Sequence, residues 1–378
     1  MAITYSVGVD AARDQIASST LPEDVKCAID NILAEIPEGE RVGIATGFKP
    51  GDNLPPGIDI LFVDENSPSQ ISLPSGVPVV ILETETGRYV DVDGSLPVIL
   101  HAGAGDDVIS VNNVTPGNVS KIWGGDGNDT INGSDQADYL FGGNGDDVIR
   151  GGAGDDTISG GAGNNLLDGD EGNDTFYLTD GADTVDGGEG VDLVLFADFI
   201  GDCEVGPVAG NSDDYRIEWE GSTAVVFNLV SGQQSEISDV EYLQWADSAI
   251  IVASNDNEGA VARLYEALFD RTGEYGGIKF WFDQYREGAT VVDIAARMLD
   301  THEGAELAAL SNEEFVDLLY HNTLGRDADA AGQAFWLDLL NESGDRAHVA
   351  ASFVLEQESE QKTADVIHIT TDDDDQLA

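Results

Sequence analysis

A nine-residue repeat constrains the fold of this chain more than any other feature of the sequence. Residues 124–195 divide without gaps into eight consecutive nonapeptides. The sixth position is Asp in seven of the eight units, the fourth is Gly in seven, and the eighth is apolar in all eight. A three-part pattern held through eight units predicts a stacked repeat architecture and argues against an irregular acidic linker.

Each nonapeptide predicts a tight turn followed by a short strand. Glycine adopts the positive φ angles that tight turns need, and alternation along the strand directs the eighth side chain inward. Two units would complete one coil of a right-handed parallel β-roll, with equivalent turns of successive coils about 4.8 Å apart. One stack of turns then carries Asp129, Asp147, Asn165 and Asp183, and the other carries Asp138, Asp156, Asp174 and Asp192. A further copy at residues 102–110 is separated from the array by a thirteen-residue insertion that contains Pro116.

Aspartates stacked at this spacing would repel one another unless cations lay between the turns. Carboxylates and turn carbonyls are oxygen ligands, and six or more such ligands in flexible geometry suit Ca²⁺ better than Mg²⁺ or Zn²⁺. Four turns per stack leave three gaps each, which predicts about six interior Ca²⁺ sites, with more at the ends and weaker sites beside Asn165 and Gln136. The predicted metal-ligand set comprises Asp107, Gly124, Asp126, Gly127, Asp129, Asp138, Gly142, Asn144, Gly145, Asp147, Gly151, Ala153, Gly154, Asp156, Gly160, Ala162, Gly163, Asn165, Gly169, Glu171, Gly172, Asp174, Asp180, Gly181, Asp183, Gly187, Glu189, Gly190 and Asp192.

The array at residues 102–195 resembles the RTX, or haemolysin-type, calcium-binding repeats of bacterial exported proteins, whose consensus is GGxGxDxUx. The resemblance implies calcium-triggered folding outside a Gram-negative cell after type I secretion. It also implies an uncleaved C-terminal export signal, and the first residues, 1–7, lack the basic stretch and apolar run of a cleaved leader.

Composition predicts a multidomain chain with five segments. They are a small N-terminal α/β or α+β domain at 1–100, the β-roll at 101–196, a β-rich capping region at 197–254, a duplicated all-α domain at 258–362 and an acidic tail at 363–378. Within the first segment, turn residues separate strands expected at 42–45, 58–63 and 77–83, and a helix is expected from Leu21 to Ile36.

The helical segment repeats with a period of 55 residues. Tyr265, Arg271, Gly277, Phe280 and Trp281 recur as Tyr320, Arg326, Gly332, Phe335 and Trp336. The segment resembles a widespread bacterial helical domain of unassigned function, marked by L-Y-x5-R followed by G-x3-W and often paired with RTX arrays. We expect the tryptophans to pack in the core; stacking on sugars is the alternative.

Charge and motifs exclude several classes of protein. With 73 acidic against 16 basic residues the formal net charge is −57, which excludes a nucleic-acid binder, and no run approaches the ~20 apolar residues that span a bilayer. Two cysteines leave no disulfide framework. His302-Glu303 lacks the second His of a zinc-protease motif, and we find no nucleophile elbow or phosphate-binding loop.

The sequence thus predicts a secreted, calcium-dependent, non-enzymatic protein of a surface layer, extracellular matrix or biofilm that self-assembles. Its expected partners are Ca²⁺, copies of itself, the type I secretion machinery and a cell-surface polysaccharide. Two alternatives stay open at this point. The first is an adhesin or glycan-binding module that uses the helical domain, and the second is an unrecognised small hydrolase in residues 1–100 carried by an RTX export module.

Overall fold

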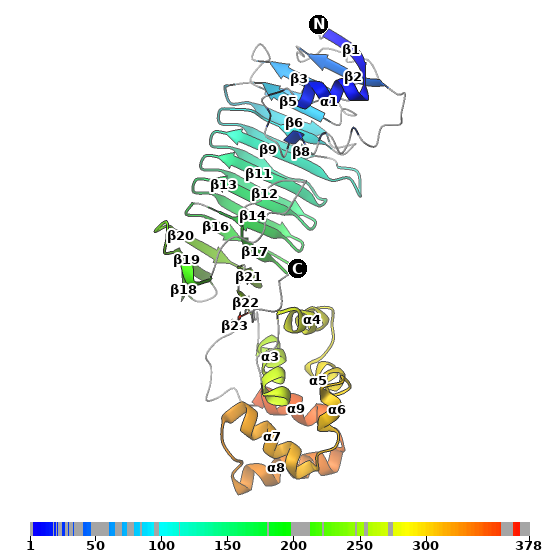
Figure 1. Ribbon diagram of the computed structural model, residues 1–378, viewed down its shortest axis with the longest axis vertical. Coiled ribbons are helices and arrows are strands. Elements are labelled where there is room, and N and C mark those ends of the chain that lie inside the picture. Colours follow the sequence, from blue (N-terminus) through cyan, green and yellow to red (C-terminus); the bar gives the residue numbers. More distant parts are fainter. Residues whose placement is uncertain are drawn as a thin grey trace. The chain divides into compact units, whose positions relative to one another are not determined.

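The computed structural model (Figure 1) divides the chain into two compact units, residues 1–246 and 247–378, and each is described by itself. The described residues are 3–17, 19, 21, 25, 26, 29, 33, 41–46, 60–64, 70–73, 79–83, 85–93, 98–112, 114–179, 181–197, 212–220, 223–245, 248–252, 256–270, 275–356 and 366–370. Among these residues no helix is both long and apolar enough to cross a membrane.

The first unit is built on a parallel β-solenoid of about six turns, visible as the stack of strands in Figure 1. Strands alternate along the chain between two sheets, so each coil contributes one strand to each. The first sheet has the order β1(Ile3–Gly8), β2(Arg41–Thr46), β3(Ile60–Asp64), β5(Val79–Glu83), β7(Ile99–His101), β9(Ser120–Asp126), β11(Asp138–Asn144), β13(Thr157–Ala162), β15(Thr175–Leu178), β17(Leu193–Phe196) and β21(Tyr242–Gln244). The second has the order β18(Tyr215–Glu220), β19(Thr223–Asn228), β20(Gln234–Ser238), β16(Thr184–Asp186), β14(Leu166–Glu171), β12(Val148–Ala153), β10(Thr130–Asn132), β8(Val108–Asn112), β6(Tyr89–Asp93) and β4(Gln70–Leu73).

The eighth position of each nonapeptide forms the solenoid interior, as the alternation predicted. In one sheet Ile131 stands opposite Ile149 and Leu167 opposite Val185. In the other sheet Leu140 stands opposite Ile158, and all eight eighth-position side chains of the array are fully buried. Burying one such side chain contributes roughly 1.5–3 kcal/mol, so this thin strip is the main apolar support of the repeats.

The predicted thirteen-residue insertion was wrong for most of its length. Ser120 and Ile122 stand at the sixth and eighth positions of a degenerate unit, residues 115–123, because Ile122 pairs in register with Leu140 and is fully buried. Only residues 111–114 are extra. The unit was missed because it lacks the aspartate and the glycine turn, while it keeps the inward apolar side chain that the stack requires.

The region before the array continues the same two sheets. Strands β2, β3 and β5 confirm the predicted strands, and β3, β5 and β7 pair in parallel with their neighbours. An apolar layer covers the face of the first sheet opposite the interior, where α1(Val9–Ala17) packs. The layer comprises Ala12, Ile16, Leu21, Val25, Ile29, Leu33, Val42, Ile44, Ile60, Val79, Ile81, Ile99, Trp123 and Phe141. The positions Val25, Lys26, Ile29 and Leu33 of the predicted helix are helical. Leu21, its predicted first residue, lies in a bend and not in the helix, and the other positions lie outside the described residues.

At the other end, both sheets continue past the array. Strand β20 pairs in parallel with β16 and β21 with β17, whereas β19 and β18 add to β20 as an antiparallel hairpin. Trp245 stacks on Phe196 with ring centroids 4.4 Å apart, and Tyr215 contacts both rings. These large side chains close the apolar interior beyond the last repeat.

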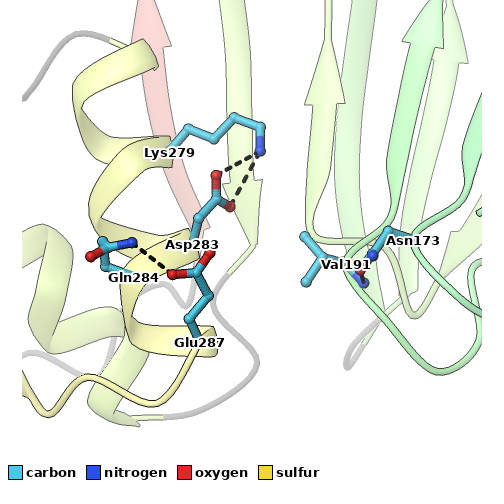
Figure 2. A network of polar contacts seen from close by, with 6 residues as sticks. All are labelled: Asn173, Val191, Lys279, Asp283, Gln284 and Glu287. Carbon is cyan, nitrogen blue, oxygen red and sulfur yellow. Dashed lines mark hydrogen bonds and ion pairs between the residues drawn. The ribbon is translucent and has the colours of Figure 1, made fainter.

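The second unit is helical. Its elements are α3(Asp256–Phe269), α4(Tyr275–Arg286), α5(Val291–Leu299), α6(Gly304–Leu307), α7(Asn312–Leu324), α8(Ala330–Ser343) and α9(Arg346–Glu356), with the antiparallel strands β22(Ser248–Val252) and β23(Val366–Thr370). Strand β23 lies within the segment predicted as an acidic tail. Capping boxes begin α5 at Thr290 and α7 at Ser311, and on α4 Lys279 forms an ion pair with Asp283 (Figure 2).

The two copies of the helical repeat make the same aromatic contacts. Trp281 and Trp336 are buried, which confirms that the tryptophans pack in the core. Each makes an edge-to-face contact with the preceding phenylalanine, Phe280 or Phe335. Trp281 also donates its Nε1–H to the Tyr265 hydroxyl at 3.2 Å.

Candidate metal centre

The sixth-position side chains form two columns that run along the solenoid. Each step of a column joins a residue to its counterpart one coil further on. We define column A as Arg88, Asp107, Asp129, Asp147, Asn165, Asp183 and Ser235, and column B as Ser120, Asp138, Asp156, Asp174, Asp192 and Glu241. The structure therefore brings together the predicted aspartates in the two stacks that the repeat implied, and it adds residues at the column ends that sequence reasoning missed.

A ladder of hydrogen bonds holds each column together. The backbone N–H of each member donates to a side-chain oxygen of the next member, as Asp129 does to Asp147 Oδ1 at 2.7 Å and Asp156 to Asp174 Oδ1 at 2.7 Å. The aspartates of both columns are buried, with at most 4 % of their surface exposed. One oxygen of each carboxylate thus accepts a backbone hydrogen bond, and the second oxygen is buried beside it.

The second carboxylate oxygens are the candidate ligands of the site. In the described part of the chain, Oδ2 of Asp107, Asp129, Asp147, Asp156 and Asp174 has no hydrogen-bond donor. A buried carboxylate oxygen without a donor costs free energy unless a cation or proton meets it. Column B begins differently, because Ser134 donates both its backbone N–H and its hydroxyl to Asp138 Oδ2 at 2.8 Å.

A backbone carbonyl faces the same space as the free oxygens of Asp129, Asp147, Asp156 and Asp174. A Cβ built on Gly124 would overlap Asp129 Oδ2 and lie 2.7 Å from the Gly142 carbonyl oxygen of the next coil. Gly151 repeats the arrangement with Asp156 Oδ2 and the Gly169 carbonyl oxygen. Only glycine leaves this space open, and the converging oxygens fit Ca²⁺, which accepts carboxylate and carbonyl oxygens together. In the described residues no three acidic, His or Cys side chains converge.

Asn165 changes the column at one point. Its Oδ1 accepts the backbone N–H of Asp147 at 2.9 Å, and its Nδ2 donates to Asp183 Oδ1 at 2.9 Å. An amide N–H therefore stands where the other members place a carboxylate oxygen. This geometry agrees with the prediction of a weaker site beside Asn165, because an amide nitrogen is not a ligand for Ca²⁺.

The remaining predicted ligands lie around the turns. The side chains of Asp126, Asn144, Glu171 and Glu189 are exposed at the surface of the turns. Their carbonyls accept N–H groups of the fourth-position glycines, as Glu171 does from Gly154 at 2.8 Å. Asp180 lies outside the described residues, and the ligand set as a whole stays a prediction.

Burial raises the pKa of the column carboxyls. The pKa is about 8 for Asp156, about 7 for Asp107, Asp147 and Asp174, and about 6 for Asp129 and Asp183, with removal from water the largest cause each time. For Asp156, the neighbouring carboxylates of Asp174 and Asp138 raise the pKa further. Without metal, the folded columns hold protons that an unfolded chain has lost.

We therefore expect the metal-free array to lose stability as pH rises. Unfolded aspartates titrate near pH ~3.9, so the contribution of the protonated columns is complete below that pH and is lost as pH rises through 6 to 8. Circular dichroism of calcium-free protein between pH 5.5 and pH 8 measures the loss of strand signal. With calcium the slope should reverse, because the metal binds the deprotonated carboxylates. An equal strand signal at both pH values without calcium contradicts the expectation.

The fourth-position glycines are required by the stacking distance. Gly145 has φ 138°, and a Cβ there would overlap the Gly127 carbonyl oxygen. Gly145→Ala should lower the unfolding midpoint of the calcium-loaded protein in urea well beyond the ~1–3 kcal/mol of backbone strain alone. Gly117→Ala is the matched control, because Gly117 has φ 90° and nothing within 4 Å of its Cβ position. Equal shifts for the two variants would show that the overlap does not matter.

A second, exposed ladder runs beside the buried one at the fifth position of the repeat, and sequence reasoning missed it. Asn128 Oδ1 accepts the N–H of Asp146 at 2.7 Å, and Asn173 Oδ1 accepts the N–H of Val191 at 3.0 Å (Figure 2). Here the later coil donates to the earlier one, opposite to the buried ladder. The recurrence of Asn or Asp at the fifth position was the available signal.

Comparison with known proteins identifies two regions. Residues 99–113, 123–158, 141–176 and 159–194 match the RTX calcium-binding nonapeptide repeat. Residues 295–363 match a domain of unknown function (DUF4214). No curated protein matches the chain. The stacked coils, the two columns of buried carboxylates and the four repeat matches together support an RTX-type protein whose β-solenoid binds calcium.

Proposed function

We propose that the protein is a secreted, non-enzymatic structural component of a bacterial surface layer or extracellular matrix, which folds on binding Ca²⁺ and assembles with copies of itself. RTX repeats are typical of secreted proteins, and the RTX solenoid is a structural calcium-binding fold. In this proposal the solenoid is a spacer that calcium makes rigid, and the segments at its two ends make the contacts between copies.

The observation that carries the proposal is the burial of carboxylates in two continuous columns. A chain with a net charge of −57 repels itself and its copies. Cations held in the columns remove part of this repulsion where the coils stack. Calcium would then control both the folding of the array and the approach of one copy to another.

Electron microscopy and size-exclusion chromatography of the full chain, with and without Ca²⁺, test the proposal. Ordered polymers or discrete oligomers that form with Ca²⁺ and dissolve in chelator support it. A chain that folds with Ca²⁺ and stays monomeric at millimolar calcium and high protein concentration overturns the assembly while it leaves calcium binding intact.

A binding role for the helical unit is a second candidate, and it has its own observation. Phe280 and Phe335 occupy equivalent positions of the two copies and are 52 % and 54 % exposed. Two exposed phenylalanines at one repeat position favour contact with a partner such as a surface polysaccharide. The buried tryptophans cannot offer their faces in the same way.

Glycan binding by the calcium-loaded chain tests this second candidate. Phe335→Ala should weaken binding several-fold, while Leu339→Ala on the same helix is the control for a general change in α8. Retained binding in the Phe280→Ala, Phe335→Ala double variant contradicts the role of this surface.

A further inference from the structure

The first member of column A is an arginine. Its place in the register is clear, because Arg88 donates its backbone N–H to Asp107 Oδ1 at 2.5 Å, as Asp107 does to Asp129 Oδ1 at 2.7 Å. Two residues later Val90 stands opposite Ile109 in the interior. Arg88 thus holds the sixth position of a degenerate unit, residues 83–91, and it is 7 % exposed.

The buried guanidinium brings a permanent positive charge to the end of the acidic column. Arginine stays protonated at any relevant pH. Arg88 and Asp107 are both buried and occupy equivalent positions in adjacent coils of column A. These two adjacent coils therefore bring together a buried carboxylate and a buried cation that belongs to the chain itself.

The coils on this side of the array also have more apolar support than the repeats do. In addition to the interior residues Val80, Val90 and Leu100, the outer face of the first sheet is covered by the apolar layer that includes Val79, Ile81 and Ile99. Inside the array this layer continues only to Phe141, and a smaller outer cluster of Tyr177, Leu195 and Ala197 lies further along. Neutralised charge and a two-sided apolar core occur together at this end of the solenoid.

We propose that Arg88 takes the place of a calcium ion in the first gap of column A, so that the coils formed by β5 to β8 close without metal. These coils then present a preformed edge on which the calcium-dependent coils stack. The inference rests on calcium binding by the array and is independent of the proposed assembly.

Hydrogen exchange of the full chain, with mass spectrometry of peptides covering residues 85–112, tests this role. In chelator at pH 8, the wild-type chain should keep these amides protected while residues 124–195 exchange. Arg88→Gln should speed exchange in 85–112 several-fold, because the buried cation is lost, whereas Arg88→Lys, which keeps the charge, should remain close to wild type.

Arg88→Asp supplies the second measurement. It restores a gap with two carboxylates, so protection of residues 85–112 should disappear in chelator and return with calcium. The proposal is overturned if Arg88→Gln exchanges like wild type, or if calcium fails to restore protection in Arg88→Asp. If the wild-type chain binds no calcium at all, the proposed function falls as well, which separates the two failures.

Discussion

Removal of calcium at pH 8 should unfold the repeat array and leave the helical unit folded. At that pH most column carboxyls are charged, since their pKa values lie between about 6 and 8. Members of one column are a single strand spacing of ~4.8 Å apart, and the interior strip is too thin to offset their repulsion. The helical unit has an apolar core, with Leu264, Phe282 and Phe353 fully or almost fully buried.

Far-UV circular dichroism and hydrogen exchange measure the two parts separately. The strand signal and the protection of residues 124–195 should disappear in chelator and return with Ca²⁺, while the helical signal persists. Mg²⁺ is the matched control, because it demands a smaller and more regular set of ligands and should not restore the array. Full protection of 124–195 in chelator at pH 8 would contradict the role assigned to the metal.

Substitution of Asp156 should have the largest effect of any single change in the columns. Asp156 lies between Asp138 and Asp174 in column B, accepts the N–H of Asp138 at 2.7 Å and has its Oδ2 free of donors in the described part of the chain. Asp156→Ala removes the free Oδ2 and leaves the N–H of Asp138 buried without an acceptor. We expect the calcium concentration at half-folding to rise roughly ten- to a hundredfold.

Asp156→Asn separates the two contributions. The amide keeps the acceptor for Asp138 and removes the charge, as Asn165 does naturally in column A. This variant should bind calcium more weakly and yet be more folded than wild type in chelator at pH 8, because one buried charge is gone. Asp135→Ala, which removes an equally negative but exposed side chain, is the control. A calcium titration of Asp156→Ala that matches that control would refute the assignment.

The sequence predicted the stacking of the coils because strict positions carry it. An apolar residue at the eighth position recurs in all eight units and Asp at the sixth in seven of them, and Asp147 and Ile149 lie where the repeat placed them. The degenerate units were missed because they lack the Asp and Gly residues by which the repeat was recognised. In these units the apolar side chains of Ile122 and Val90 point into the interior. The backbone N–H groups of Ser120 and Arg88 donate to the next coil. Neither contact requires Asp or a glycine turn.

Other features were beyond a sequence pattern because they depend on partners one coil away. The fifth-position ladder needs only a short side-chain acceptor on the earlier coil, so Val191 takes part through its N–H alone. The side chains of Asp126 and Asn144 looked like ligands in the repeat, but the turn directs them to the surface, where Asn144 donates to Asp126 at 2.7 Å. Glu241 joins column B from a segment with no glycine turn.

The two ladders run in opposite directions, so every interior coil both donates to and accepts from each of its neighbours. Most joints between interior coils therefore follow the same hydrogen-bond pattern, with Asn165 as an exception, and an eighteen-residue segment could be lost or duplicated with that pattern kept. Loss or gain of nine residues would instead move each following strand to the other sheet. Arg88 would then stand in column B and Ser120 in column A. Evolution is thus free to lengthen or shorten this rod, but only in whole coils.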